Sequence, residues 1–381
     1  MTSFDFDNAP DRRSTDSMKW GRYTGRDVLP LWVADMDFAA APPILEALRE
    51  RVAHGVFGYA EPWPSLLKAT TDHLAGEYGW DVDPSWIVWL PGVVPGLNVA
   101  RRAVGGTAFT ATPIYPPFLS APEVLLTAPL RRGEVRWEWD LPAVERALTP
   151  ECRLFLLCHP HNPTGRAWEL AELEAVHDLA RRRDLVVCSD EIHCGLVLDA
   201  GRRHHPFATL SEDAARRSIT LMAPSKTFNV PGLGCAFAVI PDRPLRQRFQ
   251  RAMRGIIPHV NVLGLVACEA AFRHGGPWHR ALLDYLRGNR DHLLAALRSM
   301  APLVTTPVEA TYLAWIDARA TGLADPQRHF EAEGVGLSAG RAFGPGDLYQ
   351  GFVRLNFGCP RAVLDEALLR MRRALAREER R

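Results

Sequence analysis

Short apolar runs alternate with amphipathic stretches through the middle of the chain. The apolar runs are Trp86–Leu90, Thr107–Ala111, Leu154–Cys158, Leu185–Ser189, Ile219–Ala223 and Phe237–Ile240. Helical patterns lie between several of these runs, most clearly over 169–183. Continuously apolar strands that alternate with helices are typical of a mostly parallel sheet covered by helices on both faces. We therefore predict an α/β fold with a sheet of this kind at its centre.

A second α/β pattern occupies the C-terminal part of the chain. It follows a helical region over 261–300 and has strands within 311–317 and 351–358, a helix near 325–333 and a basic helix over 361–380. The first 50 residues also lie outside the alternating region.

These patterns and the length of 381 residues predict three parts. Residues 51–280 form a large cofactor-binding domain, and 281–381 form a small C-terminal α/β domain. Residues 1–50 are expected to pack with the small domain.

Composition and charge exclude several classes of protein. Lys and Arg together number 45 and Asp and Glu 44, and this balance argues against nucleic-acid binding by bulk charge. The chain has no apolar stretch of the roughly 18 residues that a membrane span needs, and its first residues lack the apolar core of a signal peptide. Seven cysteines without a C-x-x-C pair favour reduced thiols. We expect a cytoplasmic enzyme that binds neither nucleic acid nor membrane.

Several catalytic motifs were tested and rejected. No lysine follows a glycine, as a P-loop requires, and no zinc signature is present. The adjacent ligand types at 190–194 do not form one tetrahedral site, so we expect no metal. Gly336–Gly340 matches G-x-S-x-G, but no histidine follows Ser338, as a hydrolase elbow requires. We interpret this match as a glycine-rich turn.

Two segments at predicted strand ends carry features of a ligand site, because open α/β sheets bind ligands there. Gly92, Val93, Val94 and Pro95 follow the first apolar run and open a helix, whose free N–H groups can hold a phosphate. Asn162 lies in a constrained turn, HPHNPTG, after a later run. Taken singly, the first segment is also compatible with an ordinary loop, and Asn162 is equally compatible with a residue that only caps the following turn.

A carboxylate and a lysine follow two further strands. Asp190 leaves a buried run and needs a cationic or donor partner there, unless it caps a helix. Lys226 follows the run ITLMA, where a buried amine can act as a nucleophile, unless it reaches the surface. Of the other lysines, Lys19 lies in the polar N-terminal segment and Lys68 on an amphipathic helix.

Together, a phosphate seat, an asparagine, an aspartate and a lysine at successive strand ends match the needs of pyridoxal phosphate. Its phosphate requires the helix N-terminus, its aldehyde an amine, its pyridine nitrogen a carboxylate and its ring hydroxyl a donor. We predict this cofactor, with Lys226 as the amine.

Motifs along nearly the whole chain also resemble a known family. They are WVADMDF, HGVFGY, PGVVPGL, TPIYPPF, HPHNPTGRAW, SDEIH, SKTFNVPGL and FVRLNFGCPR. The chain resembles the fold-type I, class I/II aminotransferase-like enzymes, and more narrowly the MalY/PatB type of cystathionine β-lyases. WVADMDF and SDEIH separate this group from ordinary aminotransferases, which more often carry Tyr at the position of His193.

The resemblance implies roles around the cofactor. Lys226 forms the Schiff base, Asp190 pairs with the pyridinium nitrogen, and Asn162 and His193 approach the ring hydroxyl. Tyr115 stacks on the ring.

The resemblance also implies a phosphate site and a substrate site. The backbone at Gly92, Val93 and Val94 holds the phosphate together with Ser225. Tyr59 reaches the phosphate of the other subunit, which makes the active unit a homodimer.

Arg354 is implied to pair with the substrate carboxylate, for which the guanidinium fork is suited. Trp32, Tyr59 and Asn162 are expected near the substrate, and the side-chain pocket is expected to draw on Trp32–Phe38 and on Phe57–Trp63 of the partner.

Two positions depart from the family pattern. Ala223 stands where many relatives have a phosphate-binding Ser, and Gly234 stands where many aminotransferases have a phosphate-binding Arg. We expect a more weakly or differently held cofactor, because a charge-assisted contact contributes about 1.5–3 kcal/mol.

The expected reaction is β-elimination of a cysteine S-conjugate such as cystathionine, which yields a thiol, pyruvate and ammonia. Transamination with the same residues is one alternative, and elimination or decarboxylation of a large cysteine conjugate in specialised metabolism is another. A non-enzymatic regulatory role has no sequence feature in its favour.

Overall fold

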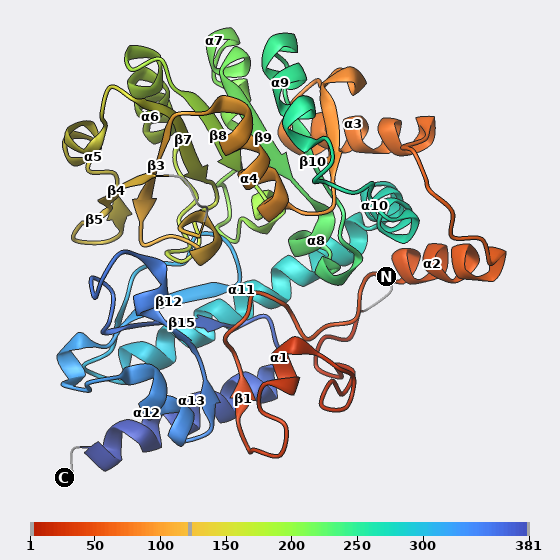
Figure 1. Cartoon of the computed structure of the whole chain (residues 1–381). Coiled ribbons are helices and arrows are strands. Elements are labelled where there is room, and N and C mark those ends of the chain that lie inside the picture. Colours follow the sequence, from red (N-terminus) through yellow and green to blue (C-terminus); the bar gives the residue numbers. More distant parts are fainter. Residues whose placement is uncertain (1–3, 121–123, 379–381) are drawn as a thin grey trace.

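The computed structural model describes residues 4–120 and 124–378. A large seven-stranded sheet with its helices lies above a smaller four-stranded sheet in Figure 1, and the long helix α11 (Gly276–Arg298) runs beside the smaller sheet. Within the described residues, no helix combines the length and apolarity needed to cross a membrane.

The large sheet confirms the predicted α/β class. Its strand order is β2 (Ile87–Leu90), β10 (Ala236–Val239), β9 (Ser218–Met222), β8 (Val186–Asp190), β7 (Cys152–Cys158), β3 (Thr107–Thr112) and β4 (Leu125–Pro129). Strand β10 runs antiparallel to both its neighbours, and the other pairs are parallel. Strand β4 was missed in the sequence because it is only partly buried, whereas the predicted strands are continuously apolar.

Helices cover both faces of this sheet. They are α3 (Pro64–Tyr78), α4 (Val93–Val104), α5 (Leu141–Ala147), α6 (Leu170–Arg182), α7 (Glu212–Arg216), α9 (Arg243–Met253) and α10 (Val262–His274). Neighbouring residues of a strand point to opposite faces. Phe155 accordingly joins the core cluster beneath α6, and Leu156 joins the cluster beneath α4. Burial on both faces explains why the strands are continuously apolar.

The smaller sheet has the strand order β11 (Val304–Thr305), β12 (Leu313–Asp317), β15 (Phe352–Asn356) and β14 (Ser338–Ala339). Helices α11, α12 (Pro326–Ala332) and α13 (Arg361–Glu378) accompany it. Further elements are the helix α2 (Pro42–His54), the short helices α1 (Met18–Gly21) and α8 (Pro224–Thr227), and the strand pair β5 (Arg131–Arg132) and β6 (Trp137–Glu138).

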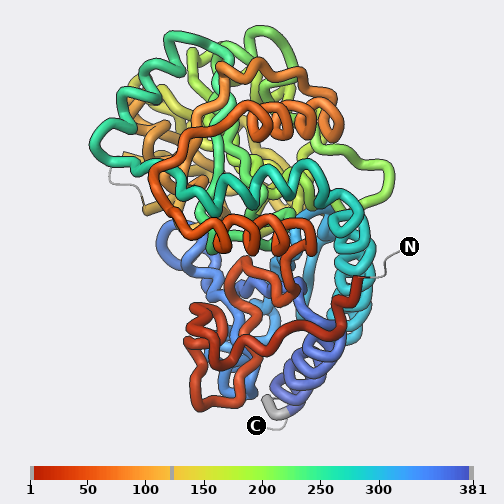
Figure 2. Tube along the Cα trace, turned by 90° about the vertical axis from the view of Figure 1, so that its right-hand side faces the viewer, coloured from red at the N-terminus to blue at the C-terminus, as the bar shows by residue number. Residues whose placement is uncertain are grey.

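The N-terminal segment packs against the C-terminal part of the chain. Strand β1 (Leu29–Pro30) pairs in parallel with β13 (Val335–Gly336), and Figure 2 shows the red N-terminal segment in the same half of the molecule as the blue C-terminal part. Leu31 and Met36 belong to the same core cluster as Leu355. These contacts support the proposal that the first 50 residues pack with the small domain, although the proposed boundaries at residues 50 and 280 fall within α2 and α11.

The interpretation of Gly336–Gly340 as a turn is wrong. Gly336 ends β13, Ser338 begins β14, and Gly340 opens a short 3₁₀ helix. The sequence pattern was misleading because these strands are only two residues long.

Candidate active site

A cavity lies at the C-terminal ends of the parallel strands, beside the start of α4. The predicted residues that line it are Gly92, Val93, Val94, Tyr115, Asn162, Asp190, His193, Ser225 and Lys226. The crossover connections of the sheet bring these segments to one edge, as the rule for open α/β sheets requires. Arg354, Trp32 and Tyr59 do not line this cavity, and each is placed below.

Lys226 is held near the end of β9 on the short helix α8. Its Nζ donates a hydrogen bond to the Ala34 carbonyl at 2.5 Å. Burial lowers the pKa of the Lys226 amine to about 8, although the nearby carboxylates of Asp35 and Asp190 act in the opposite direction. A lysine with this pKa is partly neutral near physiological pH and is therefore a competent nucleophile and base.

Asp190 is the last residue of β8 and is only 4% exposed. Its Oδ1 accepts a hydrogen bond from the Ile192 backbone at 3.1 Å, and within the described residues no basic side chain forms an ion pair with it. Burial raises the pKa of Asp190 to about 7. A buried carboxylate in this state is stabilised by a cation, so Asp190 fits the protonated nitrogen of a pyridine ring.

His193 and the start of α4 offer further groups for the same ligand. His193 is buried, which lowers the pKa of its ring to about 3, and its Nδ1 has no hydrogen-bond partner among the described residues. Gly92 precedes α4 without a side-chain cap, which leaves the first N–H groups of the helix for an anion. An uncharged donor and an anion seat in one cavity match the ring hydroxyl and the phosphate of pyridoxal phosphate.

The two departures from the family pattern lie close to this seat. Gly234 lines the cavity in the left-handed region, with φ of 56°. Ala223 is buried and precedes α8, and its methyl group cannot donate a hydrogen bond. The backbone N–H groups of α4 and Ser225, which lies in the same cavity, remain the predicted phosphate-binding groups.

Arg354 lies on β15 next to the cavity and is 4% exposed. Its Nη1 donates to Asn162 Oδ1 at 3.0 Å, and its Nη2 donates to the Trp32 carbonyl at 2.8 Å. Its guanidinium carbon lies 5.0 Å from the centre of the Phe343 ring. These partners are all neutral, and no carboxylate among the described residues forms an ion pair with Arg354. A buried cation of this kind is a receptor for a carboxylate ligand.

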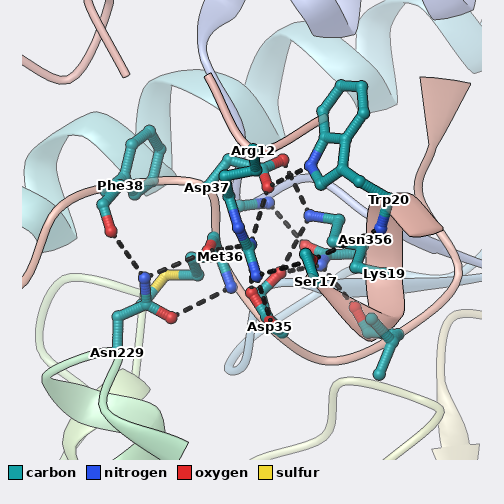
Figure 3. A network of polar contacts seen from close by, with 12 residues as sticks. Arg12, Ser17, Lys19, Trp20, Asp35, Met36, Asp37, Phe38, Asn229 and Asn356 are labelled. Atoms are coloured by element: carbon teal, nitrogen blue, oxygen red, sulfur yellow. Dashed lines mark hydrogen bonds and ion pairs between the residues drawn. The ribbon is translucent and has the colours of Figure 1, made fainter. Parts of the chain in front are cut away.

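The segment 32–38 supplies backbone carbonyls to both cations of the site, and Figure 3 shows the polar contacts that hold it. Lys19 donates to Asp37 Oδ2 at 2.7 Å and to the Asp35 carbonyl at 2.9 Å. Arg12 forms a fork with the Asp35 carboxylate and also contacts Asp37. Lys19 lies in the polar N-terminal segment, as the sequence indicates, but its side chain is fully buried.

Sequence reasoning missed the Ala34 carbonyl and the Tyr312 hydroxyl, which also donates to that carbonyl at 3.0 Å. A backbone carbonyl leaves no trace in residue identities. The signal that was available is the placement of Asp35 and Asp37 within an apolar run, since a buried carboxylate requires a partner.

Tyr59 is 98% exposed and lies near His259, with 6.1 Å between ring centres. Its neighbours Val56 and Phe57 are also exposed. The chain thus presents Tyr59 outward, away from its own cavity, and its role across a subunit interface stays a prediction.

Comparison with known proteins agrees with this geometry. Residues 26–371 match the family described as aminotransferase class I and II. Cystathionine β-lyase PatB of Bacillus subtilis is 39% identical, over 97% of this chain and 100% of its own.

Two solved structures are similar over the full length. That of OvoB is 50% identical with a TM-score of 0.94, covering 98% of this chain and 99% of its own. That of a C–S lyase from Staphylococcus hominis with bound pyridoxal phosphate is 29% identical with a TM-score of 0.90, covering 98% of each chain. Pyridoxal 5′-phosphate is therefore the cofactor of this enzyme. The chain belongs to the class I and II aminotransferase family, in its group of pyridoxal-phosphate-dependent carbon–sulfur lyases.

Proposed function

We propose that this enzyme is a β-lyase that cleaves cystathionine or another cysteine S-conjugate into a thiol, pyruvate and ammonia. The observation that carries the proposal is the full-length similarity to a cystathionine β-lyase. The paired arrangement of Lys226 and Arg354 beside one cavity supports it.

Arg354 would fix the substrate by its carboxylate. The guanidinium offers two parallel N–H donors, and its burial strengthens the charged contact. The Asn162 amide and the Trp32 carbonyl hold the fork in place from opposite sides. This contact directs the substrate α-carbon toward the cavity that Lys226 lines.

Lys226 would act as the base that removes the α-proton. With a pKa of about 8, part of the amine is neutral near neutral pH, and this neutral form can accept a proton. The Ala34 carbonyl then accepts a hydrogen bond from the ammonium group, and the Asp35 carboxylate stabilises its charge. When bound, pyridoxal phosphate supplies an electron sink for the pair left by the departing proton.

Asp190, His193 and Tyr115 would hold the ring in the state and orientation that this chemistry needs. The Asp190 carboxylate retains the proton on the ring nitrogen, because a nearby cation offsets the cost of burying its charge. His193 stays neutral and can serve as a hydrogen-bond donor to the ring hydroxyl. Tyr115 is half-buried at the cavity wall, where its ring can stack on the cofactor.

Loss of the Cβ–S bond completes the elimination. The electron pair of the Cα–H bond becomes the new Cα–Cβ double bond, and the Cβ–S pair leaves with the thiolate. The released 2-aminoacrylate takes up water to give pyruvate and ammonia.

The proposed active unit is a homodimer in which Tyr59 reaches the phosphate of the partner's cofactor. The exposure of Val56, Phe57 and Tyr59 on one segment supports this arrangement. Mixing Lys226→Ala subunits with Tyr59→Phe subunits tests it, because hybrid dimers regain one intact site. A mixture no more active than its separate parents contradicts the shared site. The free and buried state of all seven cysteines supports a cytoplasmic location.

The decisive experiment supplies cystathionine and an S-alkylcysteine to the purified holoenzyme and assays pyruvate and free thiol. We expect both products in equal amounts, with none from Lys226→Ala. Failure of every cysteine S-conjugate to yield pyruvate, together with conversion of the cofactor to its amine form, would replace the proposal by transamination.

A further inference from the structure

Ser338 lies beside the most buried cation of the site, in the G-x-S-x-G segment that has no hydrolase role. Strands β14 and β15 pair in antiparallel fashion, and Ser338 is directly opposite Arg354. Directly opposed residues in such a pair have their side chains about 5 Å apart on the same face. The strand register therefore delivers the serine hydroxyl to the guanidinium.

The Ser338 hydroxyl connects two groups that hold Arg354. It donates a hydrogen bond to the Trp32 carbonyl at 2.6 Å. Its oxygen accepts from Arg354 Nη2 at 3.3 Å, and the same Nη2 donates to the Trp32 carbonyl at 2.8 Å. The Ser338 hydroxyl, the Trp32 carbonyl and Arg354 Nη2 are therefore each hydrogen-bonded to the other two.

The flanking glycines have a packing reason of their own. A side chain at Gly336 would overlap the Tyr23 ring, with contacts of 2.5–2.6 Å. One at Gly340 would meet the backbone oxygens of Tyr349 and Phe352 at 2.3 and 2.4 Å. The close packing of neighbouring residues against Gly336 and Gly340 restricts the backbone of β13 and β14 to one path. The motif thus holds the serine in one place beside Arg354.

We propose that Ser338 is a positioning residue that orients the Arg354 guanidinium for the carboxylate of the substrate. This inference rests on the proposed role of Arg354. The half-buried hydroxyl restrains Nη2 from the side of the small sheet, whereas Asn162 restrains Nη1 from the side of the large sheet. The two terminal nitrogens of the Arg354 guanidinium are thus held by different residues, which come from the two different sheet regions.

The test measures ligand binding to the holoenzyme through the absorbance change of the cofactor. 2-Aminoisobutyrate is the probe, because it lacks an α-proton and therefore cannot undergo elimination or transamination. Isopropylamine, which is the same molecule without the carboxylate, is its partner probe. We expect Ser338→Ala to weaken 2-aminoisobutyrate binding about tenfold, the scale of a hydrogen bond to a charged group. Binding of isopropylamine should change less than twofold.

Three variants separate positioning from a general structural effect. Ser338→Thr keeps the hydroxyl and should restore binding to within about threefold of the natural chain. Ser299→Ala is the matched control: Ser299 also donates to a carbonyl, that of Ala296, and accepts from Arg372, but it lies at the end of α11. It should leave both probes unchanged. Thermal unfolding of each variant verifies that it is folded.

A double-variant comparison tests whether Ser338 acts through Arg354. Arg354→Ala alone should remove the preference for 2-aminoisobutyrate, and adding Ser338→Ala should cause no further loss. An equal loss for both probes in Ser338→Ala, or its full effect in the Arg354→Ala background, overturns the inference. If Arg354→Ala lowers the preference and Ser338→Ala does not, only this inference fails. If Arg354→Ala leaves the preference intact, the carboxylate site fails and the inference fails with it.

Discussion

Replacement of Lys19 by methionine tests the polar network beneath the segment 32–38. Lys19 is fully buried and Asp37 is 4% exposed, with 2.7 Å between the ammonium and Asp37 Oδ2. Removing one partner of a buried ion pair costs about 3–5 kcal/mol, because the other charge is left without compensation. Arg12 and Trp20 still contact the other carboxylate oxygen, Oδ1. We therefore expect a loss near 3 kcal/mol in the free energy of unfolding.

The chain offers a matched control in Lys68. Lys68 also forms a 2.7 Å ion pair, with Asp72, but the two side chains are 74% and 61% exposed. Exposed helical pairs four residues apart contribute about 0.3–0.5 kcal/mol, so Lys68→Met should cost less than about 0.5 kcal/mol.

The assay is urea unfolding of the cofactor-free protein, followed by tryptophan fluorescence and extrapolated linearly to water. Adding Asp37→Asn to Lys19→Met should recover part of the loss, since it removes the uncompensated charge. If Lys19→Met and Lys68→Met have the same unfolding free energy, the reasoning about the buried pair is refuted.

Three further outcomes follow from the site. Lys226→Ala should abolish pyruvate formation and the absorbance of a lysine–cofactor Schiff base; any activity retained at the natural level would exclude Lys226 as the base. Arg354→Lys should raise KM by about tenfold to a hundredfold and change kcat much less, because one of two charged hydrogen bonds is lost; steady-state kinetics measures this, and a selective fall in kcat contradicts it. In the cofactor-free protein, burial lowers the pKa of the Lys226 amine to about 8. Its acetylation should therefore rise with pH and reach half its maximum near pH 8, followed by mass spectrometry with Lys68 as the exposed reference, and a midpoint above pH 10 contradicts the burial.

The alternating pattern of the sequence was sufficient to predict the large sheet and the edge at which the cavity lies. Buried strands such as Leu154–Cys158 are continuously apolar, and the polar residues Asp190 and Lys226 follow two such runs in the sequence. Local patterns determine such features because strand burial and helix starts depend on neighbouring residues. The same reasoning failed for β4 and for Gly336–Gly340, where the elements are too short or too exposed to leave a period.

The sequence by itself determined the fold class and the cofactor, and it predicts that Lys226 is the amine that binds it. Only the tertiary structure decided how the two cations of the site are held. The carbonyls of Trp32 and Ala34 reach Arg354 and Lys226 across separations of 322 and 192 residues. Backbone carbonyls are the same in every residue, so their contribution depends on long-range packing and on buried charges such as Lys19.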